Sequence, residues 1–312
     1  MREADAAGTP LLLLAGGSNL VIADEGFDGL VLRIATRGIE RRADDGAVRL
    51  SVAAGESWDE LVAGAVADGL VGVECLGGIP GSVGATPIQN VGAYGQEVSE
   101  TIASVRVLDR RSGEVLELAP EECGFGYRTS AFKRAPGERV VLAVDFVLAR
   151  GSESAPVRYG ELARALGVEL GQSAPAEAVR EAVLALRRGK GMVVDPADPD
   201  SVSAGSFFTN PILEADAFAA LERRAGERPP AFPEPDGRVK TSAAWLVERA
   251  GFHRGYGDGR AGISSKHTLA LVNRGGATTA ELIALAREIA AGVERAFGVA
   301  LVPEPVFVGH RW

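Results

Sequence analysis

The chain has few of the residues that cross-link small proteins or bind metals. Its 312 residues include two cysteines, Cys75 and Cys123, and three histidines, His253, His267 and His310. Neither set has the spacing of metal ligands, so we expect no metal site. Two distant cysteines are typical of a reducing compartment, where they serve as small buried hydrophobes. The sequence therefore predicts a cytosolic protein whose fold does not depend on disulfides.

Basic clusters and long apolar segments are also lacking. Lys and Arg number 33 against 42 Asp and Glu, which gives a net charge of −9. An acidic surface repels nucleic acid at long range, so no nucleic-acid partner is expected. Near the N-terminus the longest apolar run is Leu11–Ala15, which is too short for a signal peptide or a membrane span. We expect no membrane insertion, and a monomer that acts on a small molecule.

What the chain does have in excess is glycine. Glycine supplies 40 of the 312 residues, well above the usual share of ~7%. The hydrophobic and charged fractions, 46% and 24%, are those of an ordinary globular protein. At roughly 150 residues per domain, the length predicts two domains. The Pro- and Asp-rich stretch 193–200 reads as a linker, so we place the domain boundary near residue 195.

Periodicity and capping signals predict a mixture of helices and strands. Ser57 and Glu60 form a capping box at the start of a helix, and Thr278 caps a long amphipathic helix that ends at Gly298. Strands are expected at 11–14, 31–34, 48–53, 105–108, 115–118, 140–148, 268–273 and 301–308. Helices are expected at 1–8, 57–69, 159–166, 176–187, 214–225, 242–250 and 278–298. This order indicates an α+β fold rather than a regular βαβ series. Because a helix as short as 1–8 is marginal alone, we expect the fold to begin upstream of Met1.

Two glycine turns could hold phosphate groups. The turn Gly16–Asn19 follows the first strand and offers backbone donors to a phosphate, although such a turn is more often only a turn. The second, Gly257-x-Gly259-x-x-Gly262, has the letters of the dinucleotide fingerprint. No strand is predicted before it and no helix after it, so we reject it as a Rossmann site.

Residues 72–95 form the most informative segment, with seven glycines and a single charge, Glu74. Glycine lets the backbone approach a flat, largely apolar ligand and bind its edge, as a flavin ring requires. A tightly packed crossing through the interior would give the same composition. Two further segments carry polar groups among aromatic and small residues. Arg128 lies in 124–133 and Ser206 in 203–211; taken alone, the first would be an ion-pair partner and the second a turn residue.

Five segments together resemble the UDP-N-acetylenolpyruvoylglucosamine reductase family, over about residues 9 to 309. The segments, in order, are Gly16–Leu20, Glu74–Gly95, Gly126–Lys133, Ala204–Pro211 and Pro303-Glu304. The resemblance implies an α+β fold with two parts. Residues 1–195 would form an FAD-binding region of the vanillyl-alcohol-oxidase (PCMH) type, lacking its first strand. Residues 196–312 would form a smaller α+β substrate-binding domain.

The resemblance also implies a reaction of peptidoglycan precursor synthesis in the cytoplasm. NADPH would reduce FAD, and a hydride would then pass to the enolpyruvyl group of UDP-N-acetylglucosamine enolpyruvate. By position, Ser206 matches the family's proton donor, and Arg128 and Glu304 match the residues that stabilise the enolate. Arginine can bind a carboxylate with two hydrogen bonds, and a protonated glutamate can donate to a developing enol.

Further contacts follow from the same resemblance. The implied FAD contacts are Gly16, Gly17, Ser18, Asn19, Gly78, Ile79, Pro80, Gly81, Ser82, Gly84, Ala85, Gln89, Asn90, Gly92, Ala93 and Tyr94. The implied substrate contacts are Tyr127, Tyr159, Arg187, Lys190 and Asn210. The segment that begins at Tyr159 resembles a loop of one subgroup, in which the tyrosine covers the substrate diphosphate. Arg187 and Lys190 could instead be a solvated helix end.

The sequence departs from the family pattern at two places. Family members have a further N-terminal stretch with a strand of the FAD region. Either the true start of this protein lies upstream of Met1, or the polypeptide binds FAD poorly. Where the family tends to have glutamine, this chain has His267, to which the resemblance assigns no role. Two alternatives to the reductase remain: an FAD oxidase that acts on another sugar and uses oxygen, and a non-catalytic UDP-sugar binder.

Overall fold

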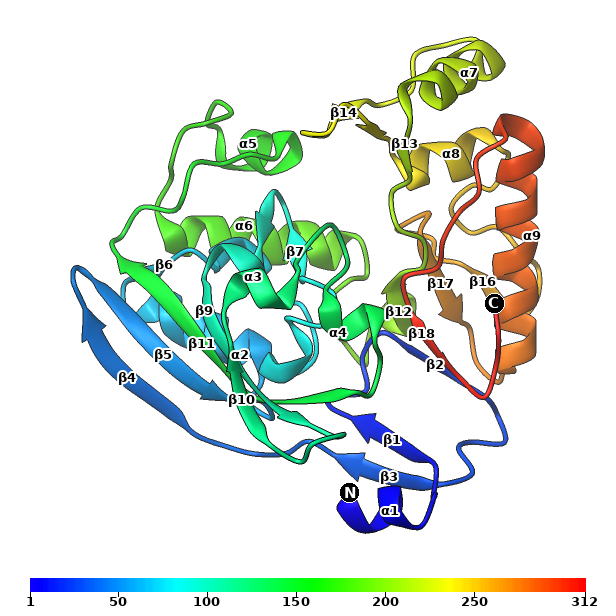
Figure 1. Ribbon diagram of the computed structural model, residues 1–312. Helices are drawn as coiled ribbons and strands as arrows, with labels where there is room; N and C mark the ends of the chain where they lie inside the picture. Colours follow the sequence, from blue (N-terminus) through cyan, green and yellow to red (C-terminus); the bar gives the residue numbers. More distant parts are fainter. The chain divides into compact units, whose positions relative to one another are not determined.

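The computed structural model describes residues 1–312 and divides into two compact units (Figure 1). Unit 1 comprises Met1–Ser18 and Asp28–Arg188, and unit 2 comprises Asn19–Phe27 and Gly189–Trp312. The chain therefore contributes to unit 2 twice, first as a short excursion and later as a long C-terminal segment. Each unit is described by itself below, and the domain boundary near residue 195 stays a prediction.

Unit 1 contains most of the strands. Its strands are β1 (Leu11–Leu14), β3 (Leu30–Arg33), β4 (Ile39–Asp44), β5 (Ala47–Ala53), β6 (Leu70–Val71), β7 (Gly92–Ala93), β8 (Gln96–Glu97), β9 (Ile102–Asp109), β10 (Val115–Leu118) and β11 (Arg139–Arg150). Its helices are α1 (Arg2–Ala6), α2 (Trp58–Ala67), α3 (Pro120–Cys123), α4 (Ala131–Arg134), α5 (Gly160–Leu166) and α6 (Ala176–Gly189), with 3₁₀ turns η1 (Glu74–Leu76), η2 (Val83–Ala85) and η3 (Val98–Glu100).

A six-stranded sheet organises unit 1, in the order β10-β9-β11-β5-β4, with β6 also paired to β11. Along β5 the residues alternate between buried and half-buried, so one face of the sheet packs into a core. Helix α2 lies against that core, where the Trp58 ring packs 5.8 Å from the Phe146 ring of β11. One half of the predicted capping box of α2 is present, since the Ser57 side chain accepts a hydrogen bond from the Glu60 N–H.

Most of the strands expected in unit 1 are confirmed. The expected hairpin is β9–β10, with Val105 opposite Leu118, and the expected long strand is β11. Strand β4 was not predicted, because its sequence, Ile-Glu-Arg-Arg-Ala-Asp, shows no alternation of apolar and polar residues. It lies at the edge of the sheet (Figure 1), and nearly all of its side chains are exposed. Because neither face of this strand is buried, the alternation of apolar and polar residues is absent.

Unit 2 is built on a three-stranded antiparallel sheet with a long helix beside it (Figure 1). Its strands are β2 (Leu20–Ile22), β12 (Ser203–Ser206), β13 (Ile212–Leu213), β14 (Phe232–Pro233), β15 (Val239–Lys240), β16 (Ala261–Ile263), β17 (Ala270–Asn273) and β18 (Val306–Val308). Its helices are α7 (Ala215–Ala225), α8 (Ala243–Arg249) and α9 (Thr279–Phe297), with the turn η4 (Pro199–Ser201). The central sheet has the order β12-β17-β16, and apolar residues of α8 and α9 share its core.

In unit 2 one predicted strand needs correction, one strand was missed, and one rejected motif is confirmed as rejected. The last strand, expected over 301–308, is only Val306–Val308, because Pro303 and Pro305 lack the N–H that a ladder needs. It pairs in parallel with β2, a strand that was not predicted. The rejection of Gly257–Gly262 as a Rossmann site is confirmed, since this segment leads into strand β16 and not into a helix.

Both cysteines are buried and free, as expected. Burial raises the pKa of the Cys75 thiol to about 12 and that of Cys123 to about 11, so neither is a ready nucleophile. The structure contains no helix with the length and apolarity needed to cross a bilayer.

Candidate functional site

The residues expected at the site fall into both units. Arg128, the glycine turn as far as Ser18, and most of the expected FAD contacts belong to unit 1. Ser206 and Glu304 belong to unit 2, together with Asn19, Lys190 and Asn210. The geometry below is given for each unit separately.

In unit 1 the start of helix α2 fixes the glycine-rich segment. The Asp59 carboxylate accepts a hydrogen bond of 2.6 Å from the Gly78 N–H, and the Trp58 indole donates to the Leu76 carbonyl at 3.1 Å. A carboxylate in the first turn is also favoured by the helix dipole. Residues 76–81 therefore have a defined path without regular secondary structure. The sequence did not single out Asp59, although an acidic residue in a first turn is a recognisable signal.

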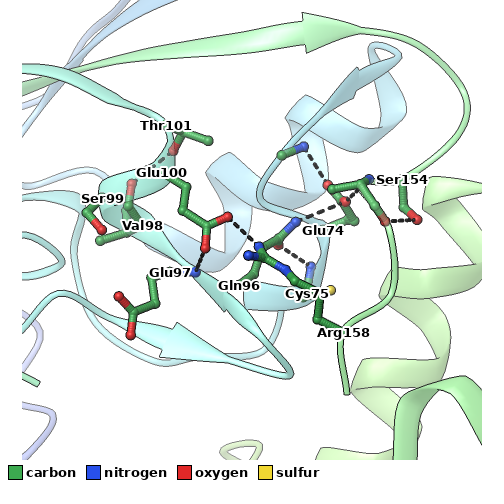
Figure 2. A network of polar contacts seen from close by, with 12 residues as sticks. Glu74, Cys75, Gln96, Glu97, Val98, Ser99, Glu100, Thr101, Ser154 and Arg158 are labelled. Atoms are coloured by element: carbon green, nitrogen blue, oxygen red, sulfur yellow. Dashed lines mark hydrogen bonds and ion pairs between the residues drawn. The ribbon is translucent and has the colours of Figure 1, made fainter. Parts of the chain in front are cut away.

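A buried carboxylate holds the beginning of the same segment (Figure 2). Glu74 has no exposed surface, and its side chain accepts hydrogen bonds from the Gly72 N–H at 2.6 Å, the Gln96 amide at 3.0 Å and the Ala155 N–H at 3.1 Å. The Gln96 carbonyl in turn accepts from the Cys75 N–H at 2.9 Å. A buried charge is tolerated only when it is fully hydrogen-bonded. Glu74 is therefore the structural anchor of the segment.

The structure brings the first glycine turn against the second. The Ser18 hydroxyl donates to the Pro80 carbonyl at 3.2 Å. A Cβ added to Gly16 would lie 3.0 Å from the Gly81 Cα, and one added to Gly81 would lie 2.7 Å from the Ser18 hydroxyl oxygen. A side chain at Gly16 would need the Gly81 backbone to shift, and at Gly81 the positive φ of 122° itself favours glycine. Two sequence segments expected to contact FAD are thus neighbours in unit 1.

The residues of these turns fit a flavin nucleotide in the chemistry that they offer. Ser82 is buried, and its hydroxyl oxygen has no hydrogen-bond partner within the structure. A buried hydroxyl without a partner costs free energy unless a ligand or water satisfies it. Gly84 packs closely on the residue that follows strand β5, where an added Cβ would lie 2.5 Å from the Ala54 Cβ. Backbone N–H groups and a hydroxyl beside packed glycines suit a phosphate and a planar ring.

Left-handed backbone is concentrated at residues that the sequence assigns to the site. Outside glycine, positive φ angles occur at Asn19, Asp45, Asn90, Tyr94 and Arg128. Asp45 belongs to the tight turn between β4 and β5, and asparagine tolerates this conformation well. Tyr94, at φ 50°, and Arg128, at φ 53°, gain no such help from their side chains. Strain of this kind persists where the surrounding structure fixes it, often at functional sites.

Arg128 is tied to the glycine-rich segment by several contacts. Its guanidinium donates a 2.6 Å hydrogen bond to the Gly92 carbonyl, and it lies 5.4 Å from the centre of the Tyr127 ring. The Asn90 amide donates to the Gly126 carbonyl at 3.2 Å and to the Glu97 carboxylate at 2.6 Å. The structure therefore brings together Asn90, Gly92, Tyr127 and Arg128, which the sequence separates by up to 38 positions.

Two expected substrate contacts lie beside two expected FAD contacts. The rings of Tyr94 and Tyr159 meet edge to face at 5.4 Å, and the Arg187 guanidinium donates to the Gly78 carbonyl at 3.2 Å. Burial raises the pKa of Tyr94 to about 12 and lowers the pKa of Arg187. The solvated helix end considered for Arg187 is therefore wrong, because this side chain is desolvated.

In unit 2 the backbone segments that carry Ser206 and Glu304 are hydrogen-bonded to each other. Ser206 is the last residue of β12, and the next carbonyl, of Phe207, accepts a 2.8 Å hydrogen bond from the Glu304 N–H. The Asn19 amide donates to the Glu304 carbonyl at 3.4 Å. The Ser206 hydroxyl lies 3.4 Å from His267 Nε2. Three residues expected at the site, Asn19, Ser206 and Glu304, are therefore arranged by adjacent backbone.

The surroundings of the remaining expected contact residues do not by themselves indicate a ligand. The Asn210 side-chain carbonyl accepts a 2.9 Å hydrogen bond from the Ala243 N–H at the start of α8, so part of its amide serves the fold. Ile79 and Ala93 pack against the core of unit 1. Gly17, Ala85, Gln89 and Lys190 are exposed or half-buried. For all of these the assigned contacts stay predictions.

Comparison with known proteins gives a consistent result. A family model described as "UDP-N-acetylenolpyruvoylglucosamine reductase, C-terminal domain" matches residues 196–308, and one described as "FAD binding domain" matches residues 1–119. The UDP-N-acetylenolpyruvoylglucosamine reductase of Streptomyces coelicolor is 62% identical over 316 residues, covering 99% of this chain and 82% of its own. That of Thermobifida fusca is 59% identical over 316 residues, covering 99% and 88%.

A solved structure agrees with these sequence matches. The crystal structure of UDP-N-acetylenolpyruvylglucosamine reductase from Thermus caldophilus superimposes with a TM-score of 0.64 at 26% identity, covering 99% of this chain and 90% of that one. The fold class expected from the sequence, an FAD-binding region joined to an α+β domain, is confirmed by this likeness and by the FAD-binding match.

Proposed function

Because the chain belongs to the UDP-N-acetylenolpyruvoylglucosamine reductase family, we propose that it reduces UDP-N-acetylglucosamine enolpyruvate to UDP-N-acetylmuramate with NADPH. It is an FAD-dependent oxidoreductase of peptidoglycan synthesis. The observation that carries the assignment of the site is the left-handed backbone at Tyr94 and Arg128. Neither side chain stabilises this conformation, so the surrounding structure must hold it. In this proposal residues 1–195 hold FAD and also supply several substrate contacts, and residues 196–312 form the smaller substrate-binding domain.

The residues that would hold FAD are those of the two neighbouring glycine turns and the segment that follows. The Gly16–Asn19 turn and Gly81–Ser82 would offer backbone donors and a hydroxyl to the pyrophosphate, and residues 84–94 would lie along the ring. When bound, FAD accepts a hydride from NADPH and supplies it to the enolpyruvyl β-carbon.

The chain's own residues would stabilise the negative charge that hydride addition creates and would then protonate the substrate. Negative charge develops on the α-carbon and its carboxylate, and Arg128 would bind that carboxylate through two parallel N–H groups. Glu304, when protonated, would donate a hydrogen bond to the same developing enolate. Ser206 would give its hydroxyl proton to the α-carbon, which completes the reduction.

Cations and a tyrosine would hold the rest of the substrate. Arg187 and Lys190 would pair with the UDP diphosphate, for which arginine offers a planar, bidentate contact. Tyr159, whose ring lies against Tyr94, would cover the diphosphate.

The proposal is tested by separating the two half-reactions. Purified protein with FAD is reduced by NADPH without oxygen, and UDP-N-acetylglucosamine enolpyruvate is then added while flavin absorbance is recorded. We expect rapid reoxidation of the flavin and formation of UDP-N-acetylmuramate. Reduced flavin that persists with substrate would contradict the proposal, as would reoxidation only by oxygen with release of peroxide, which indicates an oxidase.

Replacing Ser206 by alanine tests the proton donor. We expect Ser206→Ala to leave reduction by NADPH unchanged and to block reoxidation by substrate, because the α-carbon then has no proton source. The matched control is Ser203→Ala at the other end of β12, where the hydroxyl accepts a hydrogen bond only from the nearby Gly205 N–H at 3.2 Å. Fast reoxidation in Ser206→Ala would remove Ser206 from this role.

A further inference from the structure

The contact between Ser206 and His267 joins the proposed proton donor to a titratable side chain. The Ser206 hydroxyl oxygen and His267 Nε2 are 3.4 Å apart, and both residues are half-buried. Hydrogen bonds of catalytic groups are often long in the absence of substrate and shorten when it binds. Histidine is the side chain whose unperturbed charge changes between pH 5 and 8. The inference drawn from this contact rests on the proposed function.

The backbone around His267 is held in place by a tight set of hydrogen bonds. The buried Ser264 hydroxyl accepts from the Lys266 N–H at 3.0 Å and from the His267 N–H at 3.2 Å. The His267 carbonyl accepts from the Ala270 N–H at 3.1 Å. This turn joins β16 to β17, and β17 pairs with β12, the strand that ends at Ser206 (Figure 1).

A further hydrogen bond links the turn to the residue after Ser206. The Phe207 N–H donates to the Leu269 carbonyl at 2.7 Å. The backbone of Ser206 and the turn that carries the imidazole are therefore parts of one ladder. A contact fixed from both sides in this way is expected to persist, since neither residue lies on a free loop end.

The charged groups near the turn have partners of their own. The Asp200 carboxylate accepts from the Ser265 N–H at 2.9 Å and the Ser265 hydroxyl at 2.6 Å. Lys266 pairs with Asp198 at 2.8 Å, and Glu248 of α8 accepts a hydrogen bond from the Thr268 hydroxyl. The Glu304 backbone is bound to Phe207, the residue after Ser206. The contacts of Asp200, Lys266 and Glu248 help to hold the turn in place.

A second proton source beside a serine donor lowers the free-energy cost of the proton transfer. When Ser206 gives its proton to the substrate, its O–H bond breaks and a C–H bond forms at the α-carbon, which would leave a serine alkoxide. An alkoxide is a very strong base and is costly in a half-buried site. A neighbouring acid that protonates the serine oxygen during the same step removes this cost.

We propose that His267, as an imidazolium, transfers its Nε2 proton to the Ser206 oxygen while Ser206 protonates the substrate. The N–H bond of the imidazole breaks, the O–H bond of Ser206 re-forms, and His267 is left neutral. It regains a proton from water before the next turnover. No electrons move in this step, and no further reactant is needed. His267 is thus a positioning residue and proton relay, which acts through Ser206 and not on the substrate itself.

A kinetic experiment distinguishes this relay from a histidine that only fills space. His267→Gln keeps a hydrogen-bonding side chain at the position but cannot titrate. We expect its flavin to be reduced by NADPH at the wild-type rate and reoxidised by substrate about 10²-fold more slowly, in line with the loss of general acid catalysis. In the wild type the reoxidation rate should fall as rising pH deprotonates His267, and this dependence should be absent in His267→Gln.

The chain offers a matched control in His253, an exposed histidine whose Nδ1 contacts the Arg254 carbonyl at 2.9 Å. His253→Gln should leave both half-reactions and their pH profiles unchanged. A wild-type rate and pH profile in His267→Gln would overturn the relay. Wild-type protein whose reduced flavin is not reoxidised by the substrate would instead overturn the proposed function, so the two failures are distinguishable.

A spectroscopic measurement tests the contact without turnover and without relying on the folding of the His267 variant. With only three histidines, the imidazole ¹⁵N resonances can be assigned by comparison with His253→Gln and His310→Gln, which leaves the signal of His267 by elimination. We expect Ser206→Ala to shift the Nε2 resonance of His267 and its titration, and to leave His253 unaffected. A His267 signal that is identical with and without the Ser206 hydroxyl would overturn the proposal.

Discussion

Arg128 combines two properties that rarely occur together: a left-handed backbone and a guanidinium fixed by a backbone carbonyl. Lysine at this position would have the same charge and the same backbone strain, so it tests the shape of the cation alone. We expect Arg128→Lys to slow flavin reoxidation by substrate at least ~10²-fold, because an ammonium group cannot bind a carboxylate through two parallel N–H groups.

The control for this prediction lies six residues further along. Arg134, in the last turn of α4, donates to the Gly124 carbonyl at 3.1 Å through an exposed contact. Arg134→Lys should turn over like the wild type. Near-native reoxidation in Arg128→Lys would count against a role for Arg128 in binding the enolpyruvyl carboxylate.

Glu74 makes a prediction about stability and not about catalysis. Its buried carboxylate accepts three hydrogen bonds, and an amide would turn an N–H toward at least one of these donors. We expect Glu74→Gln to lower the free energy of unfolding by roughly 2–3 kcal/mol, measured by urea denaturation. The control is Glu100→Gln, whose pairing with Arg158 is largely exposed and is worth no more than about 1 kcal/mol. Equal effects of the two substitutions would contradict this reading of Figure 2.

At the scale of elements, helix α9 depends on the capping box at its start. The Thr278 hydroxyl accepts from the Glu281 N–H at 3.2 Å, and the Glu281 carboxylate accepts from the Thr278 N–H at 2.7 Å. We expect Thr278→Ala to lower the free energy of unfolding by about 1 kcal/mol, the usual value for an N-cap. Thr278→Ser, which keeps the hydroxyl, should restore most of this difference in a denaturant titration.

The same capping box predicts a dependence on pH. The hydrogen bond from the Thr278 N–H lowers the pKa of Glu281 below its ordinary value. A depressed pKa in the folded state means that the stabilisation is present at neutral pH and is lost as the pH falls through that pKa. Wild type should therefore be more stable than Glu281→Gln at pH 7, and the gap should close in acid. A gap of constant size between pH 7 and pH 3 would show that the carboxylate charge contributes nothing.

Element prediction from the sequence succeeded where local signals exist. Helices α2 and α9 have caps and apolar periodicity, and β5 and β11 have the residues of half-buried strands, so all four were found. Strand β4 was not predicted, because an exposed edge strand needs no alternation of apolar and polar residues. Strand β2 was not predicted either. Its partner in the parallel pair, β18, is more than 280 residues away in the sequence, so no local sequence pattern indicates the pairing.

The site could be predicted in part for a related reason. The glycine-rich segment and Arg128 were found from composition and resemblance, since their residue types are distinctive. The supports of that segment, Asp59 and Glu74, are ordinary acidic residues whose role depends on burial and on backbone donors far away in the sequence. His267 was noticed as a departure from the family pattern, but only its 3.4 Å contact with Ser206 gave it a role.

For the whole molecule, the separate hydrophobic cores of the two units predict that stability and flavin binding can be uncoupled. Leu50 lies in the core of unit 1 and Leu246 in that of unit 2, and both are buried. Each change to alanine should destabilise its own unit by about 2–5 kcal/mol, with hydrogen exchange accelerated in that unit. Because we propose that unit 1 holds FAD, only Leu50→Ala should reduce the flavin retained per chain. Equal flavin loss in both variants would contradict that assignment.

The excursion of residues 19–27 into unit 2 has a consequence for biosynthesis. Strand β2 is synthesised long before its partner β18, which spans Val306–Val308, so the pair cannot form until the chain has been made through Val308. The large sheet of unit 1 needs nothing after β11, which ends at Arg150. The nascent chain can therefore assemble that sheet while a short apolar strand waits without its partner. During this interval the growing polypeptide is most exposed to chaperones and to pairing with a neighbouring copy.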